Sequence, residues 1–367
     1  MADTDPVVVA ARRSPLTVRG RGLASVDAGA LAGQVVAAAV GDAGSPPIAD
    51  VVLGNCTGPG GNLGRIAALA AGLGVEVPGV AVDRQCGSGL AAIVDAAHAT
   101  RADGETRVAG GVESASTAPV RVQDGVPYVR APFAPVGFAD PDMLGAAEDL
   151  AGRDGLSRGR QDAYAHRSRA RARAAQVAGR FEAEIVPVAG VTRDAGFGSP
   201  SALLSRLTPI VDGGTVTAAT STRIGDGAAA VVVAPAGSGP GLAIRAGAVV
   251  GCDPALPGIG AAPAIEAALA RAGRDLGEVA AIELVEAFAA QSIAVLSRLG
   301  LRDDDERVCA EGGALALGHP WGASGAVAVV RLFSRLVRAG APAGMVGVAA
   351  ASVGGGLGVA AVFEVVR

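Results

Sequence analysis

Cys86 is the residue whose type and neighbours point most directly to covalent chemistry. It lies in the run Cys-Gly-Ser-Gly, after a strand-like segment and before an apolar stretch typical of a helix. The N-terminus of a helix carries partial positive charge and unpaired N–H groups, which lower the pKa of a thiol and favour the nucleophilic thiolate. A buried and inert cysteine is the alternative interpretation at this stage.

A histidine and a glycine run could complete such a site. His319 lies in Gly-His-Pro-Trp-Gly-Ala-Ser-Gly, where an imidazole can take a thiol proton or donate a hydrogen bond to an oxyanion. Gly354 opens a run of three glycines whose N–H groups could form half of an oxyanion hole. A structural histidine and a tight hairpin turn are the respective alternatives. His98 and His166 fall in Ala-rich helical patterns and are interpreted as structural.

The composition excludes several other chemistries. The 367 residues include 31 basic ones and no lysine, so a Schiff-base mechanism and a P-loop NTPase are both excluded. The net charge of −4 gives no electrostatic basis for binding nucleic acid. The four cysteines are widely spaced and form no CxxC, so neither a metal site nor a disulfide framework is predicted. We interpret them as reduced thiols of a cytoplasmic protein, and no apolar run is long enough for a membrane span.

The order of apolar segments predicts an α/β fold. Strand-like runs at 7–11, 51–53, 79–83 and 106–112 alternate with helical patterns at 27–40, 65–72 and 90–99, which is typical of parallel βαβ units. Residues 115–213 interrupt this rhythm with frequent prolines and a basic helix at 157–180, for which Ser157 is a plausible N-cap. The arginines at 167–173 could contact phosphate groups of a substrate or form a solvated face.

The two ends of the chain resemble each other weakly. Gly87-Ser-Gly and Ala323-Ser-Gly each precede an apolar helix, and Gly110-Gly111 and Gly354-Gly355-Gly356 each follow a later apolar strand. A duplicated α/β half would bring strand ends from both halves to one shared site. Chance similarity is the alternative in a chain so rich in Gly and Ala.

Taken together, these motifs resemble those of the thiolases, the acyl-CoA C-acyltransferases. The most specific are Asp83-Arg-Gln-Cys-Gly-Ser-Gly-Leu and Gly312-Gly-Ala-Leu-Ala-Leu-Gly-His-Pro, in that order. Further matching motifs run nearly from end to end: Ala11-Arg-Arg-Ser-Pro, Ala109-Gly-Gly-Val-Glu-Ser, Glu184-Ile-Val-Pro-Val, Gly214-Thr-Val-Thr-Ala, Asp226-Gly-Ala-Ala-Ala and Glu286-Ala-Phe-Ala. The resemblance implies the thiolase fold, with two duplicated βαβαβαββ halves in five layers. It assigns 1–114 and 214–236 to the N-terminal half, 115–213 to an inserted loop domain and 237–367 to the C-terminal half.

The same resemblance implies roles for individual residues. Cys86 matches the nucleophile that takes the acyl group from CoA, and His319 matches the residue that activates it and donates to one oxyanion hole. The N–H groups of Cys86 and Gly354 match the second oxyanion hole. The expected substrate is an acyl-CoA or acyl-carrier thioester, with no permanently bound cofactor and no metal.

Two positions depart from the family pattern. Ser352 stands where the family has the cysteine that moves the α-proton in carbon–carbon bond formation or cleavage, and an alcohol ionises far less readily than a thiol. Val285 replaces the asparagine that holds the water of the enolate oxyanion hole, and its side chain cannot hydrogen-bond. Both changes affect carbon–carbon chemistry, and neither affects acyl transfer.

Three functions therefore stay open. The leading one is Claisen condensation or thiolysis, with Cys86, His319 and Ser352 as catalytic residues. The second is acyl transfer without enolate formation, to a heteroatom or a pre-activated carbon, and the third is a non-catalytic partner subunit. The stretch 119–141 is shorter than the corresponding part of tetrameric thiolases and is expected to lack their tetramerisation loop, which favours a homodimer over a tetramer.

Overall fold

A computed structural model describes residues 4–128, 130–195 and 206–367 of the chain. The first half of its main sheet has the strand order β4-β3-β5-β8-β1, in which β3 is parallel to β4 and β5 while β8 is antiparallel to β5 and β1. The bounds are β1 (Val7–Arg13), β3 (Asp50–Gly54), β4 (Gly79–Val82), β5 (Arg107–Ser114) and β8 (Gly225–Ala234), and β2 (Thr17–Val18) pairs with β8.

The second half repeats this order. Its strands run β10-β11-β12-β9, with β10 parallel to β11 and β12 antiparallel to both neighbours. A parallel bridge between Val308 and Ile282 takes the place of β4. The bounds are β9 (Gly241–Gly251), β10 (Val279–Leu284), β11 (Val346–Val353) and β12 (Leu357–Val366). The halves join where Val7 of β1 pairs with Ala243 of β9.

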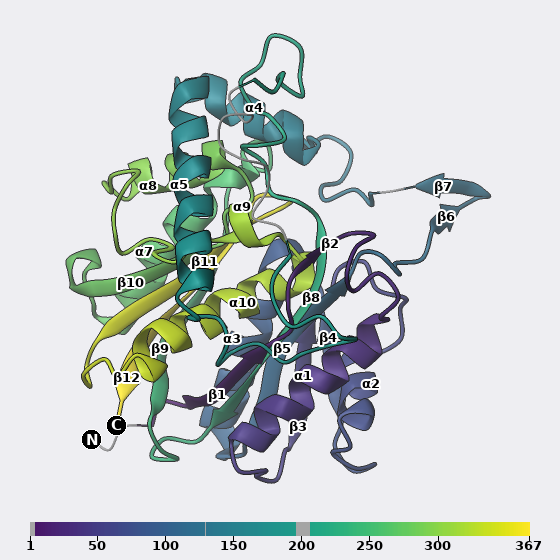
Figure 1. Cartoon of the computed structure of the whole chain (residues 1–367), viewed down its shortest axis with the longest axis vertical. Coiled ribbons are helices and arrows are strands. Elements are labelled where there is room, and N and C mark those ends of the chain that lie inside the picture. Colours follow the sequence, from purple (N-terminus) through teal and green to yellow (C-terminus); the bar gives the residue numbers. More distant parts are fainter. Residues whose placement is uncertain (1–3, 129, 196–205) are drawn as a thin grey trace.

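Helices cover both faces of each half and produce five layers (Figure 1). α1 (Ala28–Asp42) and α2 (Leu63–Ala70) pack on the outer face of the first half, and α7 (Ala261–Ala272) and α8 (Ala289–Arg298) on the outer face of the second. α3 (Ser88–Asp103) and α10 (Trp321–Phe333) lie between the halves in one shared apolar core. Because α3 and α10 occupy the same place in each repeat, the topology confirms the predicted duplication.

Glycines let the two central helices cross closely. A Cβ on Gly89 would lie 2.8 Å from the carbonyl oxygen of Gly322, and one on Gly325 would lie 2.7 Å from the backbone nitrogen of Leu90. In β5, a Cβ on Gly111 would lie 2.0 Å from the same Gly322 oxygen. A side chain at Gly89 or Gly325 would push the helices apart, and one at Gly111 would push α10 away from β5, so this close packing requires glycine. The crossing brings the N-termini of α3 and α10 together.

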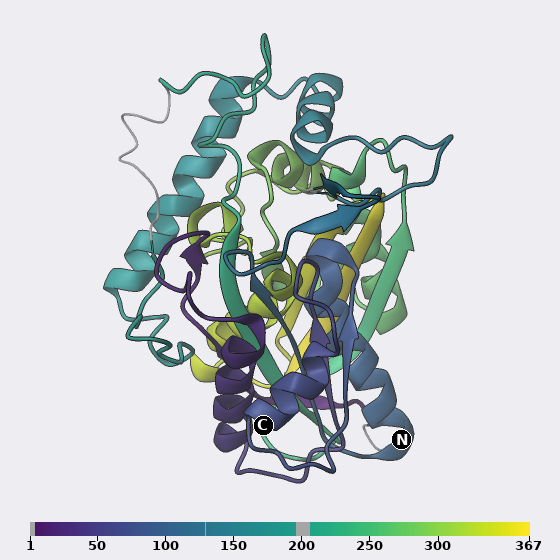
Figure 2. The ribbon, with the colours of Figure 1, turned by 90° about the vertical axis from the view of Figure 1, so that its right-hand side faces the viewer.

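The inserted segment lies over the upper part of the molecule in Figure 2, with α4 (Met143–Arg153) at the top and α5 (Arg158–Val177) running down one side. It also contains the hairpin β6 (Arg121–Gln123) and β7 (Val126–Tyr128). The predicted cap of α5 is present, since Ser157 Oγ accepts from the Arg160 N–H at 3.3 Å. The stretch 119–141 contains the projecting hairpin, on which Val122 and Val126 are exposed, and the expected homodimer stays a prediction.

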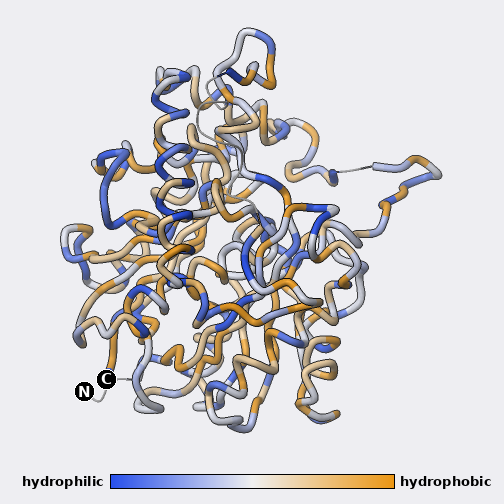
Figure 3. Tube along the Cα trace, viewed as in Figure 1, coloured by the Kyte–Doolittle hydropathy of each residue, from blue (hydrophilic) through white to orange (hydrophobic). Residues whose placement is uncertain are grey.

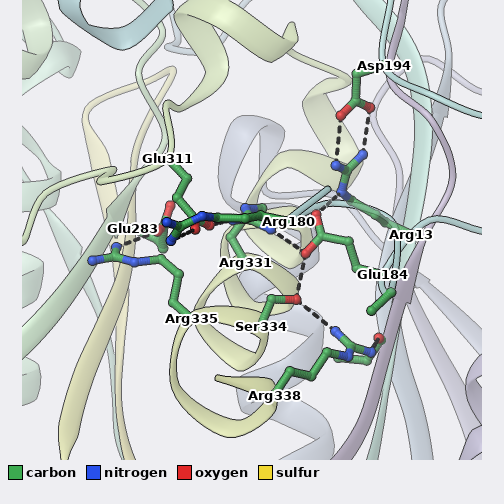
Figure 4. Close-up of polar contacts among 12 residues, drawn as sticks. Arg13, Arg180, Glu184, Asp194, Glu283, Glu311, Arg331, Ser334, Arg335 and Arg338 are labelled. Carbon is green, nitrogen blue, oxygen red and sulfur yellow. Dashed lines mark hydrogen bonds and ion pairs between the residues drawn. The ribbon is translucent and has the colours of Figure 1, made fainter. Parts of the chain in front are cut away.

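A buried ionic network ties the inserted segment to the core (Figure 4). Arg13 of β1 donates to Glu184 at 2.7 Å and holds Asp194 with two hydrogen bonds of 2.7 and 2.8 Å. Arg331 of α10 also contacts Glu184. Burial alone would raise the pKa of Glu184, but Arg331 and Arg13 lower it overall. The ion pairs of Glu184 therefore give a structural role to the motif Glu184-Ile-Val-Pro-Val, one of those that resemble the thiolases.

Polarity follows this layering. The sheet strands and central helices carry the apolar side chains, while α5 is hydrophilic along much of its length (Figure 3). In the part of the chain that the structure describes, no helix has the length and apolar character needed to cross a membrane. The remaining short helices are η1 (Gln85–Gly87), η2 (Pro257–Ile259), η3 (Leu276–Glu278), α9 (Ala314–Leu317) and η4 (Ser334–Arg338).

Candidate active site

Cys86 and His319 meet at the ends of the two central helices. Cys86 lies in η1, between β4 and α3, and its side chain is half-buried. His319 lies between α9 and α10, where its backbone N–H donates to the Arg223 carbonyl at 2.8 Å. The distance from His319 Nε2 to Cys86 Sγ is 3.2 Å. The structure thus brings together the two residues that the sequence singled out, 233 positions apart.

Ser324 fixes the protonation pattern of the imidazole. Its hydroxyl donates to the Pro320 carbonyl at 3.1 Å and lies 2.6 Å from His319 Nδ1. Because the hydroxyl proton is already used, Nδ1 is assigned the imidazole proton and Nε2 is left as an acceptor facing the thiol. Sequence analysis did not identify Ser324, although it lies in the His319 motif, one helical turn into α10.

Burial determines the charge state of the pair. It lowers the pKa of His319 to about 4 and raises the pKa of Cys86 to about 12. Hydrogen bonds from the N–H groups of Cys86 and Gly354 lower the pKa of Cys86, and the negative charge of Glu113 adds to the increase. The pKa of this thiol is therefore raised rather than lowered as expected, because desolvation outweighs the backbone N–H donors. At neutral pH the pair is a thiol and a neutral imidazole.

Two backbone N–H groups act on the sulfur. The N–H groups of Cys86 and Gly354 both lower the pKa of the Cys86 thiol, which places them as donors near Sγ. Gly354 follows β11, and the turn continues through Gly355 and Gly356, whose φ angles of 84° and 77° favour glycine. A Cβ on Gly354 would lie 2.7 Å from the ring of Phe133. The glycine run is thus a tight turn between β11 and β12, and its role in an oxyanion hole stays a prediction.

Ser352 shares a small cavity with Cys86. The cavity has a volume of about 40 Å³ and also contains Gly354 and apolar side chains of the inserted segment, including Met143 and Leu150. Ser352 Oγ donates to the Gly258 carbonyl at 2.7 Å and accepts from the Ala261 N–H at 3.0 Å. The hydroxyl thus holds its proton toward a carbonyl, which opposes its use as a base.

Val285 faces a different space. It is buried and lines a second cavity of about 30 Å³ together with Gly318 and Ser324. Cys86 does not border that cavity. An apolar side chain therefore lines this cavity together with Ser324, the hydrogen-bond partner of His319, where the family pattern would place an amide.

Other candidate side chains lie elsewhere. His98 and His166 are exposed on α3 and α5. Within the arginine-rich stretch 167–173, Arg169 is buried and donates to two backbone carbonyls, and Arg171 donates to the Val308 carbonyl at 2.7 Å. These two arginines anchor α5 to the core rather than forming a solvated face.

Comparison with known protein families agrees with this site. The family model described as "Thiolase, N-terminal domain" matches residues 6–237, and that described as "Thiolase, C-terminal domain" matches residues 239–365. The chain belongs to the thiolase family.

Individual relatives cover most of the chain. It is 39% identical over 340 residues to the Staphylococcus aureus protein named "Putative acetyl-CoA C-acetyltransferase VraB", covering 86% of this chain and 87% of the relative. It is 41% identical over 328 residues to Bacillus subtilis "Putative acetyl-CoA C-acetyltransferase YhfS", with the same coverages. The crystal structure of the Bacillus anthracis acetyl-CoA acetyltransferase superposes with a TM-score of 0.91 at 34% identity over the whole of both chains. The thiolase fold and an acetyl-CoA acetyltransferase-like function are thereby supported.

Proposed function

We propose that this protein is an acyltransferase that takes an acyl group from an acyl-CoA or carrier thioester and holds it on Cys86. The observation that carries this proposal is the 3.2 Å contact between His319 Nε2 and Cys86 Sγ, and the backbone N–H groups of Cys86 and Gly354 support it because they lower the pKa of the same thiol. That arrangement supplies a nucleophile, a base and a candidate oxyanion site.

The acyl-transfer step follows from this geometry. As Cys86 Sγ attacks the thioester carbonyl, its proton moves to His319 Nε2 and a new carbon–sulfur bond forms. The carbonyl oxygen becomes negative and accepts from the N–H groups of Cys86 and Gly354. When the carbonyl re-forms, the bond to CoA breaks and the CoA sulfur takes the proton from the imidazolium. The acyl-enzyme and free CoA result, and His319 is again neutral.

The molecule that accepts the acyl group from Cys86 determines which of two reactions follows. The names of the relatives support condensation or thiolysis, in which a base must move an α-proton. Ser352 would need help from His319 or water for that task. Acyl transfer to a heteroatom or a pre-activated carbon is the second candidate, and the Ser352 hydrogen bond to Gly258 favours it because that hydroxyl keeps its proton. A non-catalytic partner subunit is disfavoured by the intact Cys86–His319 pair.

One experiment separates these functions. The protein is incubated with acetyl-CoA and analysed by intact mass and peptide mapping for acetylation of Cys86, with Cys86→Ser as the control. Thiolysis of acetoacetyl-CoA is then assayed. Acylation with thiolysis supports a thiolase, and acylation alone supports transfer without enolate chemistry. No acylation with a series of acyl-CoAs would overturn the proposal.

We also propose that the enzyme works in the cytoplasm as a homodimer without a resident cofactor. All four cysteines are unpaired, which is consistent with a reducing compartment. Chemistry by one thiol, one imidazole and backbone donors requires no metal.

A further inference from the structure

The peptide unit joining Gln85 and Cys86 has its carbonyl side held by two side chains. The Gln85 oxygen accepts from Ser88 Oγ at 2.7 Å and from Cys56 Sγ at 3.1 Å, and the Ser88 N–H also donates to it. In a trans peptide unit the N–H points opposite to the carbonyl. Fixing the Gln85 carbonyl therefore fixes the direction of the Cys86 N–H, a donor beside the reactive sulfur that lowers the pKa of its thiol.

This peptide unit needs such support because its backbone is unfavourable. Gln85 has a φ of 44°, in the left-handed region that residues with a side chain rarely adopt. Asp83 Oδ1 accepts from the Gln85 N–H at 3.0 Å, and Ser88 Oγ accepts from the Arg84 N–H at 2.7 Å. Ser88 thus holds the turn on both sides of Gln85.

Cys56 is itself held in place. It follows β3, and its N–H donates to the buried Glu113 carboxylate at 3.1 Å. The same carboxylate accepts from the Gly322 N–H of α10 at 3.0 Å, so it connects Cys56 to the helix that follows His319. Burial and the charge of Glu113 raise the pKa of Cys56, which keeps its thiol protonated as a donor.

We propose that Cys56 and Ser88 are positioning residues for the oxyanion hole, because they hold the Cys86 N–H toward the substrate oxygen. This inference rests on the proposed acyl transfer through Cys86. Neither side chain touches the reacting atoms. Both act through the Gln85 carbonyl, and their loss lets the peptide unit rotate when charge develops on the thioester oxygen.

The test compares Cys56→Val with Cys56→Ser. Valine fills similar space without a donor, whereas the serine hydroxyl can still donate to Gln85. Two rates are measured at Cys86: acetylation by acetyl-CoA, which uses the oxyanion hole, and alkylation by iodoacetamide, which forms no oxyanion. Removing an oxyanion donor costs about 10²–10³-fold, and a misdirected donor is expected to cost on the order of tenfold.

Cys56→Val should therefore acetylate about tenfold more slowly, while its alkylation stays within about threefold of wild type. Cys56→Ser should restore the acetylation rate. Ser88→Ala provides an independent variant with the same expected selectivity. Equal acetylation by Cys56→Val and wild type, a serine variant as slow as the valine variant, or parallel losses in both rates would overturn the inference. Failure of the proposed function would appear differently, as a wild-type protein that alkylates at Cys86 but never acetylates.

Discussion

Gly89 offers a direct test of how the helix crossing builds the site. In Gly89→Ala, the new Cβ would lie 2.8 Å from the Gly322 oxygen and 3.0 Å from the Ala326 nitrogen, where ordinary contacts begin at 3.4 Å. Both neighbours are backbone atoms of α10, so α3 and α10 must separate by roughly 0.5 Å. Overpacking of this kind is expected to destabilise the protein by about 1–3 kcal/mol.

The same displacement should slow the chemistry. His319 precedes α10 and Cys86 precedes α3, so the 3.2 Å contact between Nε2 and Sγ lengthens when the helices part. Because a misplacement of about 1 Å can reduce a rate by about 100-fold, we expect acetylation of Cys86 to fall about tenfold. Urea unfolding reports the stability, and intact mass followed over time reports the acetylation rate.

Gly152→Ala is the matched control. Gly152 lies in α4 and faces open space, so a methyl group there meets no neighbouring side chain. Alanine should stabilise the protein by about 0.4–1 kcal/mol and leave acetylation unchanged. Wild-type stability together with a wild-type acetylation rate in Gly89→Ala would refute the argument that this crossing sets the Cys86–His319 distance.

Three further predictions concern protonation, the departures from the family pattern and assembly. The folded pKa of His319 is about 4 against an ordinary 6.5, so the unfolded chain binds this proton first and stability falls from pH 6.5 toward 4, by about 3 kcal/mol. His319→Asn should remove that component in urea unfolding at several pH values, and parallel pH profiles would contradict it. Ser352→Cys combined with Val285→Asn should raise acetoacetyl-CoA thiolysis at least about tenfold, because a thiol ionises more readily and an amide can hold water; unchanged thiolysis would show that these positions do not limit it. Val80→Arg, on the exposed strand β4, should convert the expected dimer into monomers in analytical ultracentrifugation, and an unchanged dissociation constant would place the interface elsewhere.

The sequence was informative where a local pattern determines structure. The alternation of strands and helices predicted the elements around Cys86, and Ser157 marked the start of α5 because capping is a local hydrogen bond. The two Gly-rich turns identified Cys86 and His319 as candidate site residues. Both halves of the duplicated fold place such a turn before a central helix, which brings the two residues together.

Properties that depend on distant residues were not predictable in the same way. The thiol pKa follows from burial by both halves and by the inserted segment, so the local helix argument gave the wrong direction. The hydrogen bond of Ser352 to Gly258 joins residues 94 positions apart, and the contact of Cys56 with Gln85 joins residues 29 apart. No spacing rule links such pairs before the sheet brings them together.

The two ends of the main sheet differ, because the second half has only a bridge at Val308 where the first half has strand β4. This difference affects how copies of the chain can associate. At one end of the main sheet, the segment around Val308 covers β10, with the Ile282 N–H donating to the Arg307 carbonyl and the Cys309 N–H to the Ile282 carbonyl, both at 2.9 Å. At the other end, among the described residues, β4 pairs with β3 alone. If the β4 strands of two copies paired about a twofold axis, neither copy would have an unpaired β4 edge left. Growth would then stop at two, and a chain so rich in alanine and valine would be protected from stacking into open-ended fibres.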